Sequence, residues 1–348
     1  MTDGAVSPLA VPMIGGLARY APPPASGLNL ADNTNLWGTP PAAAREIAAA
    51  AAGVASYPSL YGEELKAAAA GLLGVTANDV VTGCGSDNVL DAAMRAFAAP
   101  GARVAFCAPT FVMVPKFATL AGATPVPLAF RPDGDIDAEA LLAADAAITY
   151  VCAPNNPTGV QPSDAAVAQV LAHARGLVIV DEAYAEFSGR SWAGEARAHG
   201  RLLVCRTMSK AYGMAGLRAG YGVARADVVA AVERARGPYT LNALAERAAA
   251  AALRGDAAWI AEHVRLAVQT RERLAEGLHA LGYAPLPSAA NFLCVPVAGA
   301  SVVAARLRER GLLVRAFAAL PGIGDALRIT VGPWTIMQRL LDALAEDR

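Results

Sequence analysis

The sequence contains very little lysine. Lys66, Lys116 and Lys210 are the only three lysines among 29 lysines and arginines in 348 residues. Lysine differs from arginine because its amine can lose a proton, whereas a guanidinium stays protonated in proteins. A lysine that is kept in such an arginine-rich chain therefore predicts a role that needs an amine.

Several other features are scarce or missing, and each excludes a class of protein. The five cysteines form no CxxC pair and lie far from the four histidines, so we expect neither disulfides nor a metal site, and we predict a reducing, cytoplasmic location. The N-terminus lacks the pattern of a signal peptide, and no apolar run reaches the roughly 18 residues of a membrane span. The 29 basic and 30 acidic residues nearly cancel and form no basic cluster, so neither nucleic acid nor a membrane is expected as a partner. The remaining expectation is a protein with a small-molecule partner.

Short apolar runs alternate with alanine- and leucine-rich segments over most of the chain. We predict strands at 79–82, 103–107, 147–152, 177–181, 202–206 and 219–223, with helices such as 87–97, 138–144 and 164–174 between them. Strands that are apolar throughout and separated by helices are typical of a parallel sheet covered on both faces.

The pattern changes near the start of the last third of the chain. After Pro238, two long helices precede strands at 291–297, 312–317 and 326–331 and a last helix at 335–344. We predict an α/β protein with three parts: a proline-rich irregular arm (1–40), a large domain with a mostly parallel sheet between helices (41–237), and a smaller C-terminal α+β domain (238–348).

Three polar clusters follow predicted strands, and ligands of parallel sheets bind beyond the carboxyl ends of the strands. In TGCGSDN (82–88), two glycines allow a tight turn, and the N-terminus of the next helix offers an anion site. PNNPTG (154–159) contains asparagines that precede proline, and Asp181 ends an apolar strand, where a carboxylate needs a partner. Taken singly, each cluster has a structural alternative: a plain turn for the first two, and a helix cap for Asp181.

Lys210 follows the strand LLVCRT. Burial lowers the pKa of a lysine and makes the neutral amine available as a nucleophile. With an anion site and a buried carboxylate nearby, this pattern predicts a Schiff base with pyridoxal phosphate. That cofactor brings an aldehyde for lysine, a pyridine nitrogen for Asp181 and a phosphate for the helix terminus. For Lys210 alone, a surface position in a loop is the alternative.

These clusters belong to a longer series of motifs in a fixed order: GCGSDN (83–88), PTF (109–111), APNNPTG (153–159), VDEAY (180–184), TMSKAYGMAGLRAGY (207–221) and LRITVG (327–332). The series resembles the fold-type I pyridoxal-phosphate aminotransferases, whose fold is aspartate-aminotransferase-like, and within them the histidinol-phosphate aminotransferase group. The resemblance runs from about Tyr20 to the C-terminus.

The resemblance implies a role for each matched residue. Lys210 would bond to the cofactor and later move the proton at the substrate Cα, and Asp181 would pair with the pyridine nitrogen. The other implied cofactor contacts are Tyr184 and Asn156 at the phenolic oxygen, Phe111 on the ring face, and Ser86, Asp87, Ser209 and Arg218 around the phosphate. Tyr57 resembles a tyrosine that reaches the phosphate of the neighbouring subunit, which implies a homodimer with shared active sites.

The substrate residues are implied less fully. Arg328 matches the arginine that binds the substrate carboxylate or phosphate, Arg315 matches a second anion-binding arginine, and Asn35 and Tyr20 would line the pocket. Surface or packing roles are the alternatives for Arg315 and Tyr20. The arm departs from the usual Asn-Glu-Asn-Pro, because this chain has Asn-Thr-Asn-Leu at 33–36. The resemblance therefore supports the reaction type more firmly than the substrate.

The expected function is that of a pyridoxal-phosphate-dependent transaminase acting on an amino donor and an oxo acid. Histidinol phosphate with the glutamate/2-oxoglutarate pair, in histidine biosynthesis, is the first expectation. Aromatic amino-acid transamination and a threonine-phosphate-type decarboxylation remain open. A non-catalytic regulatory module is disfavoured, since such proteins carry an added DNA-binding segment and only some 30 residues precede the first matched motif.

Overall fold

The structure is a computed structural model that describes residues 7, 9–18 and 26–346. Its main element is a seven-stranded sheet in the order β2-β8-β7-β6-β5-β3-β4. The strands are β2 (Val80–Cys84), β3 (Arg103–Ala108), β4 (Thr124–Ala129), β5 (Ile148–Cys152), β6 (Leu177–Asp181), β7 (Leu202–Thr207) and β8 (Ala219–Ala224). Only β8 runs antiparallel to its neighbours, β2 and β7. The predicted α/β class with a mostly parallel sheet is confirmed.

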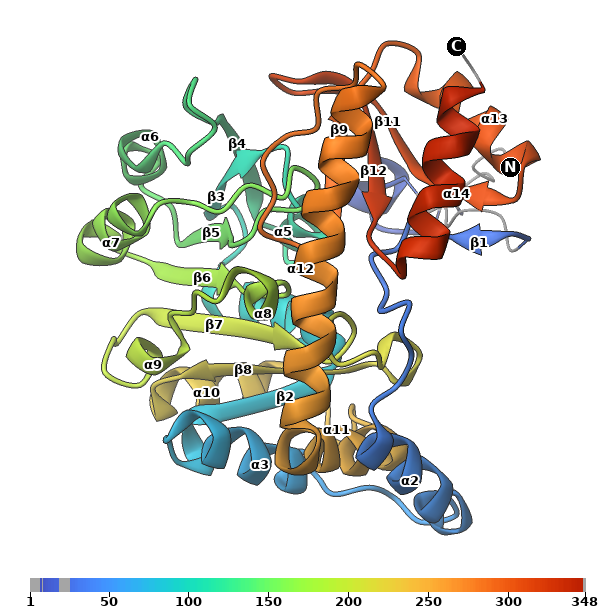
Figure 1. Cartoon of the computed structure of the whole chain (residues 1–348). Coiled ribbons are helices and arrows are strands. Elements are labelled where there is room, and N and C mark those ends of the chain that lie inside the picture. The colour runs from blue at the N-terminus through green and yellow to red at the C-terminus, as the bar shows by residue number, and fades with distance from the viewer. Residues whose placement is uncertain (1–6, 8, 19–25, 347–348) are drawn as a thin grey trace.

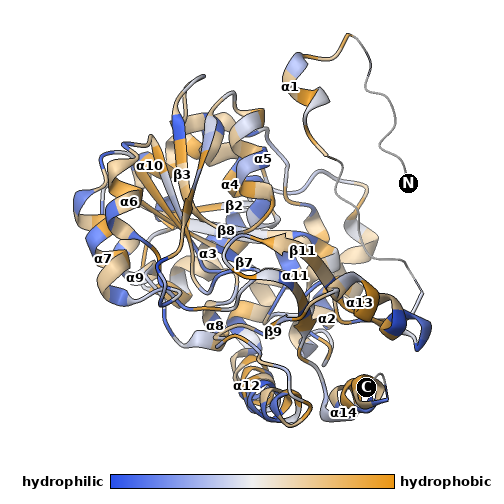
Figure 2. Ribbon diagram, turned by 90° about the horizontal axis from the view of Figure 1, so that it is seen from above, coloured by the Kyte–Doolittle hydropathy of each residue, from blue (hydrophilic) through white to orange (hydrophobic). Residues whose placement is uncertain are grey.

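Helices cover both faces of this sheet (Figure 1). Alternate strand residues enter different cores: Val178 and Val180 pack on one face, and Leu177 and Ile179 on the other. The second face carries α4 (Gly85–Phe97), α5 (Met113–Leu120) and α10 (Ala226–Ala235). The first face carries α2 (Pro41–Ala50), α3 (Glu63–Leu73), α6 (Ala138–Ala143), α7 (Asp164–His173), α8 (Ala185–Ser188), α9 (Ala193–Ala196) and α11 (Ala243–Gly255). In Figure 2 the central strands are accordingly coloured mainly as hydrophobic.

Strand β4 is a part of the sheet that the apolar pattern did not reveal. Its sequence, TPVPLA, contains Pro125 and Pro127, which cannot donate backbone hydrogen bonds. The strand is tolerated because it lies at the edge of the sheet and pairs only with β3.

A smaller core is built around a second, antiparallel sheet in the order β11-β12-β9. Its elements are β9 (Phe292–Pro296), β11 (Arg315–Leu320), β12 (Gly324–Thr330), α13 (Ala300–Glu309) and α14 (Trp334–Ala345). The 24-residue helix α12 (Ala257–Ala280) runs alongside both cores (Figure 1). Within the described ranges, no helix combines the length and the apolar character that crossing a membrane requires.

The N-terminal arm joins this smaller core. The predicted strand at 312–317 divides into β10 (Leu312–Leu313) and β11, and β10 pairs in parallel with β1 (Leu28–Asn29) of the arm. The described part of the arm also contains a short helix, α1 (Pro12–Gly15), and single-turn 3-10 helices occur at η1 (Ala51–Gly53), η2 (Ala77–Asp79) and η3 (Ala215–Leu217). The proposed domain limits at 40 and 237 stay a prediction.

Glycine at one position of β8 lets the first polar cluster pack directly on the sheet. A Cβ on Gly220 would lie 2.2 Å from the backbone nitrogen of Ser86 and 2.5 Å from the carbonyl carbon of Gly85. Both contacts are with backbone, which cannot rotate away. The turn that begins α4 therefore depends on the absence of a side chain in β8.

We expect Gly220→Ala to lower the free energy of unfolding by about 1–3 kcal/mol or more, the usual effect of overpacking. Urea denaturation measures it. Gly216→Ala is the matched control, because an added Cβ there meets nothing within 4 Å. Equal stability of the two variants would contradict the close packing of β8 on the turn.

Candidate active site

The three polar clusters meet beyond the carboxyl ends of the parallel strands. Asp181 is the last residue of β6, Asn156 follows β5, and Lys210 follows β7. Ser86 is the second residue of α4, which begins directly after β2, and Arg218 immediately precedes β8, which runs in the opposite direction. Because parallel strands end at one edge of the sheet, residues distant in sequence converge there.

Lys210 lies just beyond β7 in surroundings that favour the neutral form of its amine. Its Nζ donates a hydrogen bond of 2.8 Å to the backbone carbonyl of Asp32 and lies 5.7 Å from the centre of the Tyr184 ring. Burial, followed by the positive charge of Arg328, lowers the pKa of Lys210 from 10.5 to about 8. Its amine is therefore easier to deprotonate than that of an ordinary lysine.

Asp181 is buried at 3 % exposure but has hydrogen-bond donors on both oxygens. Its Oδ2 accepts from the Tyr150 hydroxyl at 2.7 Å, and its Oδ1 accepts from the Ala183 backbone N–H at 3.1 Å. Burial raises the pKa of Asp181 to about 6, while these two hydrogen bonds act in the opposite direction. The carboxylate therefore remains ionised at neutral pH and suits a cationic N–H group.

Arg218, Ser209 and the start of α4 form an anion cradle. The guanidinium of Arg218 donates to the Ser209 hydroxyl at 3.3 Å and to Asp87 Oδ2 at 3.4 Å. Burial raises the pKa of Asp87, and the charge of Arg218 opposes this shift. Ser86, at 8 % exposure, is the second residue of this 13-residue helix.

The backbone around the cradle requires special conformations. Arg218 has a φ of 60°, and its carbonyl accepts a 2.9 Å hydrogen bond from the Gly85 N–H. Gly85 has a φ of +73°, and a Cβ on it would lie 2.8 Å from Arg218 Nη2. Glycine is therefore needed at position 85 both for its conformation and for the approach of the guanidinium.

A further set of contacts joins the large sheet to the arm and to the smaller core. The Tyr184 hydroxyl accepts a 3.0 Å hydrogen bond from Asn33 Nδ2, and the Tyr184 ring meets Phe292 edge to face at 5.1 Å. Burial raises the pKa of Tyr184 above its usual value. Asn156 Oδ1 accepts a hydrogen bond from Arg328 Nη1.

Arg328 and Arg315 lie directly opposite each other on the neighbouring strands β12 and β11. Their guanidinium carbons are 5.7 Å and 5.9 Å from the centre of the Phe317 ring, respectively. Arg328 also donates a 2.5 Å hydrogen bond to the carbonyl of Ala31 in the arm. The smaller core thus places two cationic side chains close to the Phe317 ring.

The other predicted residues are placed as follows. Asn35 Nδ2 donates to the carbonyl of Ala211, next to Lys210, at 2.9 Å. Phe111 is half-buried before α5 and packs against the core that contains α4. Tyr57 is 85 % exposed and stacks on Tyr239, with ring centres 4.9 Å apart. Tyr20 lies outside the described residues.

Two residues of the site were not predicted from the sequence. Asn33 forms a hydrogen bond with Tyr184, and Tyr150 forms one with Asp181. Tyr150 lies on β5 two residues before Cys152, whose register partner on β6 is Asp181. Their side chains therefore share a face, but the sequence does not supply the register. For Asn33, the available signal was its match to the first asparagine of the usual Asn-Glu-Asn-Pro in the arm.

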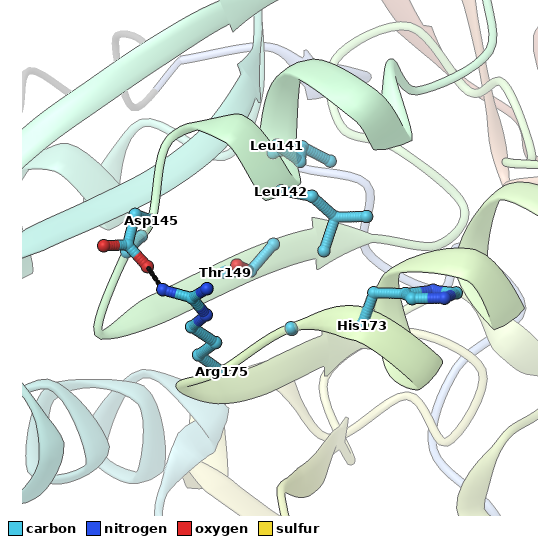
Figure 3. Close-up of a pocket in the computed structure, with 8 residues that line it drawn as sticks. Leu141, Leu142, Asp145, Thr149, His173 and Arg175 are labelled. Atoms are coloured by element: carbon cyan, nitrogen blue, oxygen red, sulfur yellow. Dashed lines mark hydrogen bonds and ion pairs between the residues drawn. The ribbon is translucent and has the colours of Figure 1, made fainter.

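A separate surface cavity of about 370 Å³ lies at the opposite ends of β5 and β6 (Figure 3). Its charged groups, Asp145 and Arg175, are exposed and pair with each other at 3.4 Å. None of the predicted site residues lines this cavity.

The residues at the carboxyl ends fit pyridoxal phosphate. Lys210 offers an amine with a lowered pKa, Asp181 offers a buried carboxylate, and Arg218 with the α4 turn offers a cradle that a side chain at Gly85 would fill. These groups match the aldehyde, the pyridine nitrogen and the phosphate of that cofactor.

Comparisons with known proteins point in the same direction. The sequence pattern of the family Aminotransferase class I and II matches residues 25–344. A histidinol-phosphate aminotransferase of Thermoanaerobacter sp. strain X514 is 34% identical over 295 residues, or 83% of this chain and 84% of the relative. Histidinol-phosphate aminotransferase 1 of Thiobacillus denitrificans is 38% identical over 328 residues, or 92% of this chain and 85% of the relative.

A solved structure is similar over nearly the whole chain. The histidinol-phosphate aminotransferase of Sinorhizobium meliloti in complex with pyridoxal-5'-phosphate superposes with a TM-score of 0.89 at 26% identity. The alignment covers 98% of each chain.

The amine of Lys210 should react with acylating reagents at a lower pH than an ordinary lysine does. In the cofactor-free protein, we expect the labelling rate of Lys210 to have its midpoint near pH 8, the value that burial and Arg328 produce. Mass spectrometry of the labelled peptides measures the rate.

Arg328→Gln is the matched variant for this measurement. Removal of a nearby positive charge favours the protonated amine, so the midpoint should rise. A midpoint near 10.5 in the unaltered protein would contradict the proposed environment of Lys210.

Proposed function

The chain belongs to the class I and II aminotransferases and is a pyridoxal-phosphate-dependent transaminase, and we propose that it transfers the amino group of histidinol phosphate to 2-oxoglutarate. A transaminase needs an amino donor and an oxo acid as partners. The identity of this donor is supported by the similarity to relatives that are histidinol-phosphate aminotransferases. In this proposal the protein acts in histidine biosynthesis.

The observation that carries this proposal is the pair of arginines on the smaller core. Arg315 and Arg328 are register partners, and both guanidinium groups lie within 6 Å of the Phe317 ring centre. Arginine suits both carboxylate and phosphate because its donors form a planar fork. Glutamate carries two carboxylates and histidinol phosphate carries a phosphate, so one pair of cations can serve both halves of the reaction.

The cofactor supplies an electron sink that stabilises negative charge at the substrate Cα. We propose that Lys210 removes and returns the proton at that carbon, because its lowered pKa allows the amine to act as a base and its ammonium as an acid. Asp181 holds the pyridine N–H, and its two hydrogen-bond donors keep the carboxylate oriented.

The remaining proposed contacts follow from the hydrogen bonds of the site. Arg218, Ser209 and Ser86 bind the phosphate, and Asp87 orients the Arg218 guanidinium. Because Asn156 Oδ1 accepts from Arg328, the Asn156 amide hydrogens face away from Arg328 and can donate to the phenolic oxygen beside Tyr184. Phe111 would pack on the ring face, and Asn35, which donates to the carbonyl of Ala211, would line the substrate pocket. The role proposed for Tyr20 rests on the sequence resemblance alone, because Tyr20 lies outside the described residues.

We also propose a homodimer with shared active sites and a cytoplasmic location. Tyr57 belongs to an exposed apolar surface with Val54, Leu60 and Tyr239, which are 58 %, 42 % and 43 % exposed. A second copy of the chain would cover this surface, and Tyr57 of the partner subunit would then reach the phosphate. The cytoplasmic location rests on five cysteines that are all free thiols.

A half-reaction panel tests the substrate. We expect histidinol phosphate and glutamate to abolish the visible absorbance of the bound cofactor, and phenylalanine and tyrosine to do so at least about tenfold more slowly, because they lack both the phosphate of histidinol phosphate and the second carboxylate of glutamate. Stopped-flow spectroscopy measures the rates.

Lys210→Ala supplies the inactive baseline for the panel. Faster reaction with phenylalanine or tyrosine than with histidinol phosphate would replace the proposed substrate by an aromatic amino acid. Release of carbon dioxide from threonine phosphate would instead indicate a decarboxylase.

Hybrid dimers test whether the active site is shared. We expect an equal mixture of Lys210→Ala and Tyr57→Ala subunits, refolded together, to recover about a quarter of the wild-type activity, because half of the dimers then contain one intact site of two. Activity and sedimentation of the mixture measure this. Mixing Lys210→Ala with Arg218→Ala is the control and should restore nothing, since both changes affect sites within their own subunit. A monomeric protein would contradict the proposal.

A further inference from the structure

Asn33 in the arm has an unusual backbone and a deeply buried side chain. Its φ is 55°, and it is 1 % exposed. Asparagine tolerates this left-handed conformation better than most residues, but glycine adopts it with less strain. The side chain of Asn33 must therefore contribute something that glycine would not.

The contacts of Asn33 connect three parts of the molecule. Its backbone N–H donates to Thr330 Oγ1 at 2.9 Å, and its carbonyl accepts from Asn291 Nδ2 at 3.0 Å. Both partners belong to the smaller core. The side-chain Nδ2 reaches the large sheet instead, where it donates to the Tyr184 hydroxyl at 3.0 Å.

The orientation of the Asn33 amide follows from Thr330. Thr330 is fully buried, and its hydroxyl donates to Asn33 Oδ1 at 3.2 Å. If the amide were reversed, the buried Thr330 hydroxyl would lose this acceptor for its hydrogen and would face the amide hydrogens instead. The NH₂ group therefore faces Tyr184.

This orientation determines the direction of the Tyr184 hydrogen. A tyrosine hydroxyl has one hydrogen and can accept through its oxygen. Because Asn33 donates to that oxygen, the hydrogen of Tyr184 points to a different acceptor. Lys210 Nζ lies 5.7 Å from the centre of the Tyr184 ring, so a cofactor bound to Lys210 would bring its phenolic oxygen near Tyr184.

We propose that Asn33 is a positioning residue that keeps Tyr184 a hydrogen-bond donor to the phenolic oxygen of pyridoxal phosphate. This inference rests on the proposed function, specifically on the role proposed there for Tyr184. The hydrogen bond from Asn33 also lowers the pKa of the Tyr184 phenol, although burial outweighs it.

The competing explanation is that Asn33 only tethers the arm to the smaller core. Its bonds to Thr330 and Asn291 would serve that purpose without Tyr184. A tether affects stability, whereas a positioning residue also affects the protonation equilibrium of the bound cofactor. The visible absorption of the cofactor changes with pH, so its midpoint distinguishes the two roles.

Two substitutions separate the functions of Asn33. Asn33→Gly removes the donor and relaxes the backbone. Asn33→Asp keeps the size and the bond to Thr330, but its carboxylate can only accept, so Tyr184 would turn its hydrogen towards position 33. In Asn33→Asp the phenolic oxygen would retain more negative charge, and the midpoint of the spectral titration should rise by about 1 pH unit, the effect of losing one hydrogen bond to a charged group. In Asn33→Gly the Tyr184 hydrogen is no longer directed but meets no new acceptor at position 33, so the midpoint should rise by less.

Tyr184→Phe and the double variant Asn33→Gly/Tyr184→Phe complete the cycle. We expect Tyr184→Phe to raise the midpoint, and the added change at Asn33 to have no further effect, because Asn33 acts through the tyrosine. Asn291→Ala is the matched control: it weakens the tether and lowers the Tm but leaves the midpoint unchanged.

The outcomes separate this inference from the proposed function. If Tyr184→Phe raises the midpoint and neither substitution at Asn33 does, only the role of Asn33 is overturned. An equal shift from Asn33→Gly with and without Tyr184 would overturn it too. If Tyr184→Phe leaves the midpoint unchanged, the proposed role of Tyr184 fails, and this inference fails with it.

Discussion

The site is built around the N-terminal arm, which meets both cores, and the arm meets the large sheet through the hydrogen bond from Lys210 Nζ to the carbonyl of Asp32. This hydrogen bond is 2.8 Å long. The preceding carbonyl, that of Ala31, accepts from Arg328 of the smaller core. Two successive carbonyls thus hold cations from the two cores, and their separation is set by the arm. Such neutral acceptors hold the cations in place without cancelling their charge.

Burial then acts on these groups according to the sign of their charge. It lowers the pKa of Lys210 to about 8 and raises the pKa of Asp181 to about 6, because a low-dielectric environment disfavours any ionised form. The two groups remain oppositely charged at neutral pH, but each lies close to its titration. This combination suits a site where one group exchanges a proton and the other must stay ionised.

Much of the fold was predictable because it depends on local patterns. Buried strands of this sheet are mostly apolar runs, so six of its strands could be located from the sequence. The strand β4 was not, since Pro125 and Pro127 argue against a strand unless it lies at an edge. Edge position is a property of the sheet order. The antiparallel direction of β8 and the pairing of β1 with β10 likewise involve partners distant in the sequence.

The sequence by itself determined which chemical groups are present and where each lies relative to a strand end. Three features can be recognised from the sequence: a rare lysine, an aspartate after an apolar strand and a glycine-rich turn. Each is unexpected in its local surroundings unless it has a function. Only the tertiary structure decided which side chains form hydrogen bonds with the predicted site residues. Tyr150 meets Asp181 through strand register, and Asn33 meets Tyr184 because the arm lies between the two cores. Tyr150 and Asp181 are separated by 31 positions in the sequence, and Asn33 and Tyr184 by 151. Hydrogen bonds over such separations arise from the packing of the chain and cannot be predicted from local sequence patterns.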